Sequence, residues 1–297
     1  MKKTWTVLEL LEWAAPYLKK YGSGSPRLDA ELLLARVLDC PRLELYLRFD
    51  QPLAMAELTA FKEYIVKRRQ GVPVAYLLGE KEFWSLPFKV GPEVLVPRPE
   101  TEHLVEAGLE FLENRREGSG RVLDIGTGCG NIILALAHQL GGRLELCWCG
   151  VDNRPAALEF ARANAAALGL ERVEFRVSDL FAGLDAGAEP FCLILSNPPY
   201  IERAALAGLP SEVRHEPTAA LDGGLDGLDF YRRIGRQARG FLEPGGALFF
   251  EVGAGQAAAV KKILASSGYD AISVRCDLAG HQRVVGGLKP AAVPEGD

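Results

Sequence analysis

Residues 121–131 read RVLDIGTGCGN. Its apolar run ends at Asp124 and Ile125, and three glycines, Gly126, Gly128 and Gly130, follow at alternate positions. The next stretch, NIILALAHQL at 131–140, has the apolar character of a well-buried helix. A buried strand that turns on glycines directly into a helix is the first half of a βαβ unit, from which doubly wound sheets are built.

The same alternation continues towards the C-terminus. Short apolar runs are separated by helical stretches such as PAALEFARANAAALG at 155–169. The buried strands that we expect are RVLDIG (121–126), ELCWCGVD (145–152), VEFRVSD (173–179), FCLILSN (191–197) and ALFFEVG (247–253). This order predicts an α/β fold with a doubly wound, mostly parallel, Rossmann-like sheet.

The residues before this region have a different pattern. From Trp5 to about Gln70 apolar residues recur at helical spacing, which predicts a small helical bundle whose third helix covers roughly 55–69. Prolines and glycines then punctuate short apolar runs, as in a hairpin. We therefore expect an N-terminal helical domain at 1–71, a β-hairpin connector at 72–99, the α/β domain at 100–290 and a disordered tail at 291–297.

Composition excludes several classes of protein. The 297 residues carry a formal net charge of -5, whereas nucleic-acid-binding domains are usually basic, so we expect no stable nucleic-acid binding. The cysteines show neither Cys-x-x-Cys spacing nor pairing with histidines, so we expect no metal site and no disulfide framework; they stand at 40, 129, 147, 149, 192 and 276. No apolar run suits a signal peptide or a membrane span, which predicts a cytoplasmic protein with no membrane partner.

The polar residues after successive strands narrow the choice of cofactor. Gly-x-Gly-x-Gly lacks the third glycine of a dinucleotide fingerprint, and no Gly-Lys-Ser or Gly-Lys-Thr follows. Asp152 ends the second strand, where a carboxylate can accept hydrogen bonds from both hydroxyls of a ribose, and Asp179-Leu180 after the third strand suits an adenine. This arrangement resembles the class I methyltransferases, which implies S-adenosylmethionine as cofactor and S-adenosylhomocysteine as product.

The fourth strand ends in Ser196-Asn197-Pro198-Pro199-Tyr200. This is similar to the Asn-Pro-Pro-Tyr motif of methyltransferases that act on amide or exocyclic amino nitrogens. Such nitrogens are weak nucleophiles, and the Asn197 side-chain oxygen and the Pro198 carbonyl can each accept one N–H, which leaves the lone pair aimed at the methyl group. Tyr200 can pack on the planar group. We expect catalysis by positioning, without a general base; an ordinary loop is the alternative.

Segments along almost the whole chain resemble one family, the protein-(glutamine-N5) methyltransferases specific for peptide chain release factors. The connector PVAYLLGEKEFWSLPFKVGPEVLVPRPETE is the most specific of these segments. The resemblance implies methylation of the glutamine in a Gly-Gly-Gln loop of the release factor. It implies catalytic and substrate-binding roles for Asn197, Pro198, Pro199 and Tyr200, and cofactor-binding roles for Gly126, Thr127, Gly128, Cys129, Gly130, Asp152, Asp179, Leu180 and Asn197.

Other functions stay open at the level of the sequence. The Asn-Pro-Pro-Tyr motif also serves DNA or RNA adenine N6-methyltransferases, which need a recognition surface for phosphates that this chain does not obviously supply. The ribosomal-protein glutamine methyltransferase differs in the connector, and an inactive scaffold would have little use for an intact Asn197. We expect residues 201–229 to cover the substrate. We expect His215 to be solvated, with a role as a base as the alternative, and Glu100 to cap the helix beginning near Thr101, with contact to the substrate as the alternative.

Overall fold

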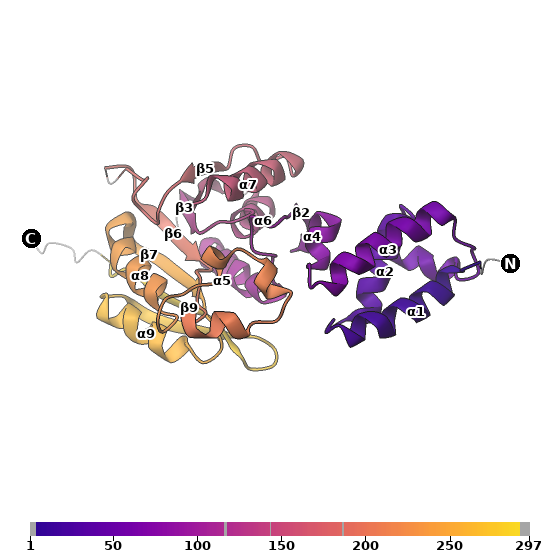
Figure 1. Cartoon of the computed structure of the whole chain (residues 1–297). Helices are drawn as coiled ribbons and strands as arrows, with labels where there is room; N and C mark the ends of the chain where they lie inside the picture. The colour runs from indigo at the N-terminus through magenta and orange to yellow at the C-terminus, as the bar shows by residue number, and fades with distance from the viewer. Residues whose placement is uncertain (1–3, 116–117, 143, 186, 292–297) are drawn as a thin grey trace, which may run out of the picture. The chain divides into compact units, whose positions relative to one another are not determined.

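The structure, a computed structural model, describes residues 4–115, 118–142, 144–185 and 187–291. The expected disordered tail lies, from residue 292 onward, outside the described residues. The chain divides into two units, whose elements are drawn in Figure 1. The first unit comprises Met1–Glu80 together with Leu209–His215, and the second comprises Lys81–Gly208 and Glu216–Asp297.

The first unit is a bundle of helices around its own apolar core. A capping box starts the first helix, because the Thr6 side chain accepts from Glu9 N and the Glu9 carboxylate accepts from Thr6 N. Phe61 and Ile65 are buried on the third helix, as the apolar spacing predicts. The elements are α1 (Val7–Lys20), α2 (Pro26–Val37), η1 (Arg42–Leu47), α3 (Met55–Arg69) and α4 (Val74–Leu78).

A buried arginine ties three segments of this unit together. Arg68, near the end of α3, donates through Nε to Asp29 of α2 and through Nη2 to Glu212, each at 2.7 Å. Glu212 belongs to Leu209–His215, the part of the first unit that comes from late in the chain. The basic residues at the end of α3 complement the helix dipole, as expected. The middle one of the three, Arg68, is also buried and has a structural role.

The connector contains the expected hairpin, β1 (Glu80–Phe83) and β2 (Leu86–Lys89), but begins with the helix α4 instead of extended chain. Trp84 and Ser85 form its two-residue turn with φ of 54° and 57°, the left-handed backbone that such a turn needs. The Glu102 carboxylate accepts from Trp84 N at 2.9 Å. The hairpin turn is thus anchored to the start of α5 (Glu102–Glu113), which follows the short turn η2 (Pro99–Thr101).

The second unit is built on a seven-stranded sheet in the order β5-β4-β3-β6-β7-β9-β8. The strands from β5 to β7 are parallel, and β9 runs antiparallel to both of its neighbours. The strand bounds are β3 (Ser119–Ile125), β4 (Glu145–Asp152), β5 (Glu174–Val177), β6 (Phe191–Ser196), β7 (Leu242–Glu251), β8 (Asp270–Cys276) and β9 (Gln282–Leu288).

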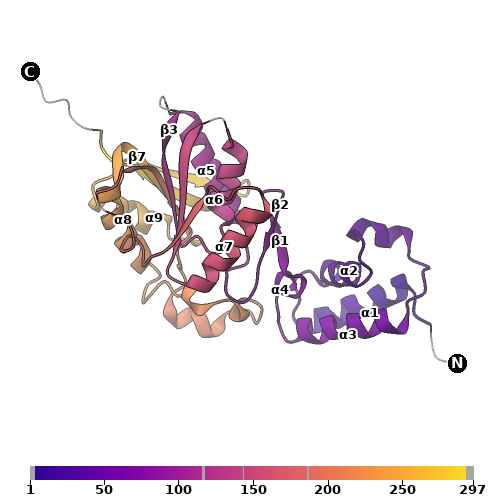
Figure 2. The same ribbon diagram turned by 90° about the horizontal axis from the view of Figure 1, so that it is seen from above.

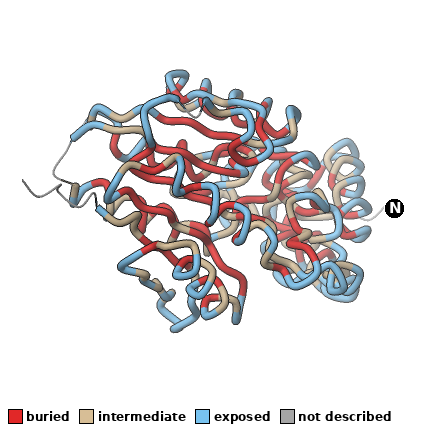
Figure 3. Tube along the Cα trace, turned by 90° about the vertical axis from the view of Figure 1, so that its left-hand side faces the viewer, coloured by how far each residue is buried: buried red, intermediate tan, exposed pale blue. Residues whose placement is uncertain are grey.

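Alternate residues of the central strands enter two cores, one on each face of the sheet. On β6, Leu193 and Leu195 join one core and Ile194 joins the other. The helices α5 and α6 (Asn131–Leu140) pack into the first core, while α8 (Asp229–Phe241) and α9 (Ala257–Ser266) pack into the second (Figure 2). Buried residues consequently run along the strands (Figure 3). The remaining helix, α7 (Pro155–Ala167), follows β4.

The predicted α/β fold, with its mostly parallel sheet, helical N-terminal part and hairpin, is confirmed. The prediction that residues 173–179 form a buried strand is wrong, because β5 is an edge strand in which Glu174, Arg176 and Val177 are exposed. The strands β8 and β9, at the other edge of the sheet, were not predicted from the sequence. Among the described residues, no helix is long and apolar enough to cross a membrane.

Candidate active site

A pocket lies at the carboxyl ends of the parallel strands in the second unit, where open α/β sheets bind ligands. Its volume is about 740 Å³, part of which is open to solvent. Polar groups come from the loops that follow β3, β4, β5 and β6, and apolar side chains come from the connector and from α8. The lining residues are Val94, Leu95, Ile125, Gly126, Gly128, Asp152, Asn153, Arg154, Ser178, Asp179, Leu180, Ser196, Asn197, Pro198, Pro199, Ala219, Ala220, Phe230 and Ile234.

The glycine loop after β3 brings backbone to the pocket wall. Gly126 and Gly128 have φ of 73° and 56°, and a Cβ on either would meet nothing within 4 Å, so the space beside them is open. The loop is held from behind, because the Thr127 hydroxyl donates to Asp124 Oδ2 at 2.7 Å. Burial raises the pKa of Asp124 to about 7, and the hydrogen bond from Thr127 opposes that rise. Thr127 therefore supports the loop and does not line the pocket.

Asp152 ends β4 with both carboxylate oxygens turned to backbone N–H groups. Oδ2 accepts from Gly128 N and Oδ1 accepts from Arg154 N, each at 3.0 Å. A carboxylate oxygen has two lone pairs, so each oxygen keeps one free to accept from a ligand hydroxyl. This carboxylate thus joins the glycine loop to the start of α7 and still offers two acceptors to the pocket.

The segment after β5 supplies a mixed polar and apolar wall. Leu180 is buried with φ of 53°, a conformation fixed by the Ser178 hydroxyl, which donates to Leu180 O and accepts from Gly183 N. Asp179 forms a two-pronged ion pair with Arg233, at 2.9 and 3.0 Å. The apolar side chain consequently faces the pocket from a rigid turn, beside Phe230 and Ile234 of α8.

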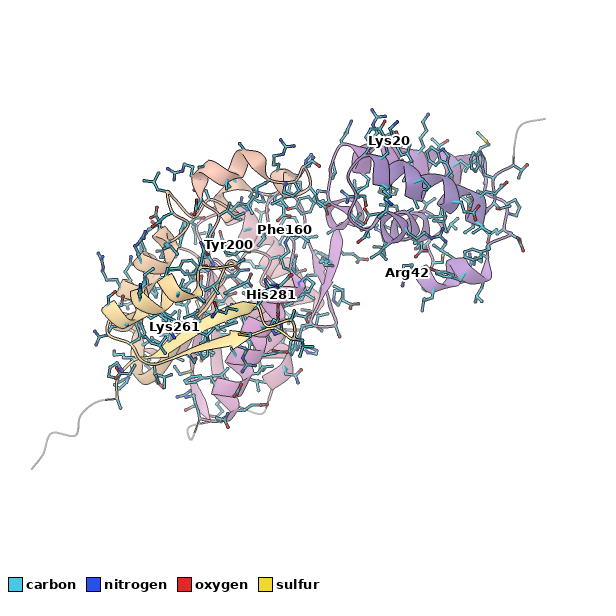
Figure 4. The ribbon with its side chains drawn as sticks, turned by 90° about the horizontal axis from the view of Figure 1, so that it is seen from below. Lys20, Arg42, Phe160, Tyr200, Lys261 and His281 are labelled. Atoms are coloured by element: carbon cyan, nitrogen blue, oxygen red, sulfur yellow. The ribbon has the colours of Figure 1, made fainter. Side chains whose placement is uncertain are left out.

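The Asn-Pro-Pro-Tyr segment starts at the end of β6. Ser196 anchors it, since its hydroxyl donates to Ile125 O at 2.7 Å. Asn197 Nδ2 donates to the Thr101 hydroxyl at 3.2 Å, while Asn197, Pro198 and Pro199 line the pocket. Tyr200 does not line it: this side chain, labelled in Figure 4, packs against the second core. Burial raises the pKa of Tyr200 to about 12, so it stays protonated at neutral pH.

The pocket therefore gathers eight of the candidate residues from the sequence. They are Gly126, Gly128, Asp152, Asp179, Leu180, Asn197, Pro198 and Pro199. Four candidate residues do not line the pocket: Thr127, Cys129, Gly130 and Tyr200. Cys129 is buried, and burial raises the pKa of its thiol to about 12, so it is inert. Gly130, with φ of 83°, occupies the N-cap of α6.

Two residues outside these motifs have clear positions. The expectation that Glu100 caps a helix is wrong, because Glu100 lies inside η2 and no side chain caps η2 or α5. Its Oε1 is 3.9 Å from Arg283 Nη2, an opposite charge. His215 is exposed, its Nε2 lies 3.1 Å from Gln70 O within the first unit, and it is not among the lining residues of the pocket.

Comparison with known proteins identifies relatives along almost the full chain. A model of the PrmC N-terminal domain matches residues 9–79, and a methyltransferase domain model matches residues 117–268. The release factor glutamine methyltransferase of Rhodopirellula baltica is 42% identical over 287 residues, which cover 95% of this chain and 95% of that protein. The enzyme of the same name from Vibrio cholerae is 43% identical and covers 94% of this chain and 95% of its own length.

The chain belongs to the release factor glutamine methyltransferases. Its second unit shares its fold with more distant methyltransferases. The T. thermophilus 16S rRNA N2 G1207 methyltransferase, solved with AdoMet and guanosine, is 21% identical with a TM-score of 0.51, over 71% of this chain and 49% of that one. At that identity the likeness shows the fold alone.

Three polar residues of this methyltransferase were missed by the sequence analysis, because their partners are distant in the chain. Thr101 accepts from Asn197, as described above. Glu216 is buried and accepts from Val96 N and from Arg98, which fixes the connector beside the Val94 and Leu95 wall. Glu251, at the end of β7, is also buried. Only the acidic character of Glu251 inside an apolar run, LFFEVG, was a signal in the sequence.

Proposed function

We propose that this protein uses S-adenosylmethionine to methylate the side-chain amide nitrogen, N5, of the glutamine in the Gly-Gly-Gln motif of peptide chain release factors. The observation that carries the proposal is the pocket that ends at Asn197 and Pro198, in a chain that aligns over nearly its whole length with release factor glutamine methyltransferases. A planar NH2 group needs two acceptors, and these two residues supply them.

The pocket residues suit the parts of this cofactor. The open glycine loop allows backbone to approach the amino acid portion, and Thr127, Cys129 and Gly130 keep that loop in shape. The two free lone pairs of Asp152 match the adjacent hydroxyls of a ribose. Ser178, Asp179 and Leu180 form a polar and apolar edge for an adenine. When bound, the cofactor supplies an electrophilic methyl group on a sulfonium.

The chain's own contribution to the chemistry is orientation. Asn197 Oδ1 and Pro198 O each accept one N–H of the glutamine amide, so the nitrogen lone pair points along the remaining direction. With the cofactor bound, that lone pair would form the new N–C bond as the methyl–sulfur bond breaks, and the extra proton on nitrogen would pass to solvent. Holding reactants in this geometry supplies up to roughly 7–11 kcal/mol of the barrier. Pro199 stiffens the loop, and Tyr200 anchors it through its carbonyl, which accepts from Gln256 Nε2 at 2.9 Å.

We assign substrate recognition to the helical domain at 1–71 and methyl transfer to 100–290, with the β-hairpin connector at 72–99 joining them. Every lining residue with a role in the chemistry follows residue 120. The motifs before that point have no reactive character. Release factors are therefore the proposed partner, and stable nucleic-acid binding is not part of the function.

Labelled cofactor tests the proposal directly. Purified release factor, the same factor with its Gly-Gly-Gln glutamine changed to alanine, and a nucleic-acid fraction are each incubated with the enzyme. We expect label in the first alone and a mass gain of one methyl on the glutamine peptide. Label that survives loss of the glutamine, or that enters nucleic acid, would overturn the assignment.

A variant tests the role of Asn197. Asn197→Ala removes one acceptor from the reacting nitrogen, and loss of one such interaction costs on the order of 10²–10³ in kcat. Affinity for S-adenosylhomocysteine should change far less, since the acceptor faces the substrate. Turnover within a few-fold of the parent protein would remove the mechanism.

A further inference from the structure

Asn197 is part of a buried polar cluster with Thr101 and Glu251. The strands β6 and β7 are parallel neighbours in which Ser196 pairs with Phe250, so Asn197 and Glu251 leave adjacent strands at the same level. Thr101, in η2, lies beside both: its hydroxyl accepts from Asn197 Nδ2 at 3.2 Å and forms a hydrogen bond with the Glu251 side chain. Thr101 and Glu251 are only 2% and 3% exposed.

The orientation of the Asn197 amide decides whether it can serve the reaction. A carboxamide presents an acceptor oxygen on one side and two donor hydrogens on the other. With Nδ2 turned to Thr101, Oδ1 is directed elsewhere, and no described residue donates to it. After a flip, the NH2 group would oppose the NH2 group of the substrate, and one of the two acceptors would be lost.

The Thr101 hydroxyl is able to select one orientation only if its own proton is committed. A hydroxyl donates once and accepts twice. An ionised carboxylate is an acceptor only, so Glu251 accepts the hydrogen bond from the Thr101 hydroxyl. The lone pairs of the Thr101 oxygen are then left to face Asn197. Those lone pairs attract Nδ2 and repel Oδ1. The ionised Glu251 carboxylate therefore fixes the direction of the Thr101 hydroxyl, which in turn fixes the orientation of the Asn197 amide.

We propose that Thr101 and Glu251 are positioning residues, which hold the Asn197 amide with its oxygen towards the substrate nitrogen. The inference rests on the proposed function and adds two residues to it. Neither touches the substrate; both act through Asn197.

The burial of Glu251 supports a role beyond packing. Its Oε2 is buried without a hydrogen-bond partner among the described residues, which is a costly arrangement that cores usually avoid. Burial raises the pKa of Glu251 to about 7, and the Thr101 hydrogen bond opposes that rise. The charged and titratable groups around it are Glu100, Arg283, Arg98, Tyr200 and Tyr231. Because the pKa of Glu251 lies near neutral pH, a change of pH there can reverse the direction of the hydrogen bonds from Glu251 through Thr101 to Asn197.

A matched pair of variants at Thr101 tests the proposal. Thr101→Val keeps the shape and removes the hydroxyl, whereas Thr101→Ser keeps the hydroxyl. Since a hydrogen bond contributes about 0.5–1.5 kcal/mol, Thr101→Val should lower kcat for release factor roughly two- to tenfold, with KM and affinity for S-adenosylhomocysteine unchanged. Thr101→Ser should retain the parent kcat. Equal kcat for Thr101→Val and the parent would overturn the proposal, as would a loss that Thr101→Ser shares.

Glu251→Gln supplies a second readout. Ionised Glu251 holds the productive orientation, so kcat of the parent should rise as the pH increases through about 7, and the rise should be absent in Glu251→Gln. An unchanged pH profile in that variant would contradict the role of Glu251.

A spectroscopic measurement separates this inference from the proposed function. The Asn197 side-chain amide gives its own ¹H–¹⁵N signals, which are identified by their loss in Asn197→Asp. In enzyme bound to S-adenosylhomocysteine alone, Thr101→Val should shift these signals and Thr101→Ser should not. Parent enzyme that fails to methylate release factor refutes the function. Signals that do not move in Thr101→Val refute the positioning role, whatever the substrate is.

Discussion

At the scale of the residue, Asp152 combines a structural role with a proposed ligand role. Its two oxygens bind Gly128 N and Arg154 N, and the remaining lone pairs are free for a ribose. Charge-assisted hydrogen bonds are worth about 1.5–3 kcal/mol, so Asp152→Ala should weaken S-adenosylhomocysteine binding roughly ten- to a hundredfold, as measured by calorimetry. Asp270→Ala, at an exposed position on β8, is the control. Unchanged binding in folded Asp152→Ala would refute the ribose assignment.

Glu251 predicts a dependence of stability on pH. Burial raises its pKa from 4.5 to about 7, so between these values the unfolded chain releases the proton and the folded protein retains it. The contribution to stability is therefore complete below pH 4.5 and lost as the pH rises to 7. Glu251→Gln has no such loss, and its free energy of unfolding should exceed that of the parent by on the order of 1–3 kcal/mol at pH 8, and by less at pH 5.

Urea unfolding of the two proteins at both pH values checks this expectation. Glu171→Gln, on the surface, is the control and should show no such difference. A Glu251→Gln protein that gains nothing between pH 5 and pH 8 would show that the buried carboxyl is not strained. If Glu251→Gln is more stable than the parent at pH 8 and also lacks the rise of kcat with pH, then Glu251 lowers stability in order to orient Asn197.

At the scale of the element, the sequence predicted the helices and strands that have a clear apolar repeat or a continuous apolar run. The α3 range and the strands around the glycine loop follow from apolar repeats of 3.6 or from continuous apolar runs. It failed for α4, because five residues between prolines and a glycine are too few to show a period. It also failed for the burial of β5, because position at the sheet edge depends on strand order and not on composition.

The ion cluster of the first unit gives an element-scale prediction. Arg68→Met removes the cation that pairs with buried Asp29, and a buried charge left without its partner costs about 3–5 kcal/mol. Urea unfolding of the full chain should detect this loss. Lys67→Met, at an exposed position one residue earlier, should change stability by less than about 0.5 kcal/mol. Equal stability of the two variants would show that Arg68 is dispensable for joining α2, α3 and Leu209–His215.

At the scale of the whole molecule, the sequence identified the motif residues of the site but not their supports. Asn197 and the glycine loop are local motifs, so their chemistry is visible in a few consecutive letters. Thr101 and Glu251 reach Asn197 only because η2 and β7 are placed beside the end of β6 by the sheet order. Side chains brought together from such distant positions, 96 residues apart for Thr101 and Asn197, leave no periodic signal, so they could be found only in the folded chain.

The helical unit carries most of the exposed apolar side chains, which makes it the proposed docking surface for the protein substrate. Of the eleven large apolar side chains exposed among the described residues, eight lie between Trp13 and Val66. Trp13 and Tyr17 on α1 and Tyr21 directly after it recur every four residues, with successive ring centroids 5.1 and 5.0 Å apart. Aromatic side chains of this kind are the usual anchors of protein interfaces.

Replacing two of these rings should therefore affect the protein substrate and not the chemistry. Because anchor residues cost more than about 1 kcal/mol each when truncated, Trp13→Ser with Tyr21→Ser should raise KM for intact release factor roughly tenfold or more. The value of kcat/KM for a short Gly-Gly-Gln peptide should stay at the parent level, since the peptide lacks the rest of the factor that these rings are proposed to bind. Val177→Ser with Leu278→Ser, which changes exposed apolar residues of the second unit, is the matched control. An equal loss on peptide and intact factor, or no loss on either, would show that α1 does not recognise the substrate.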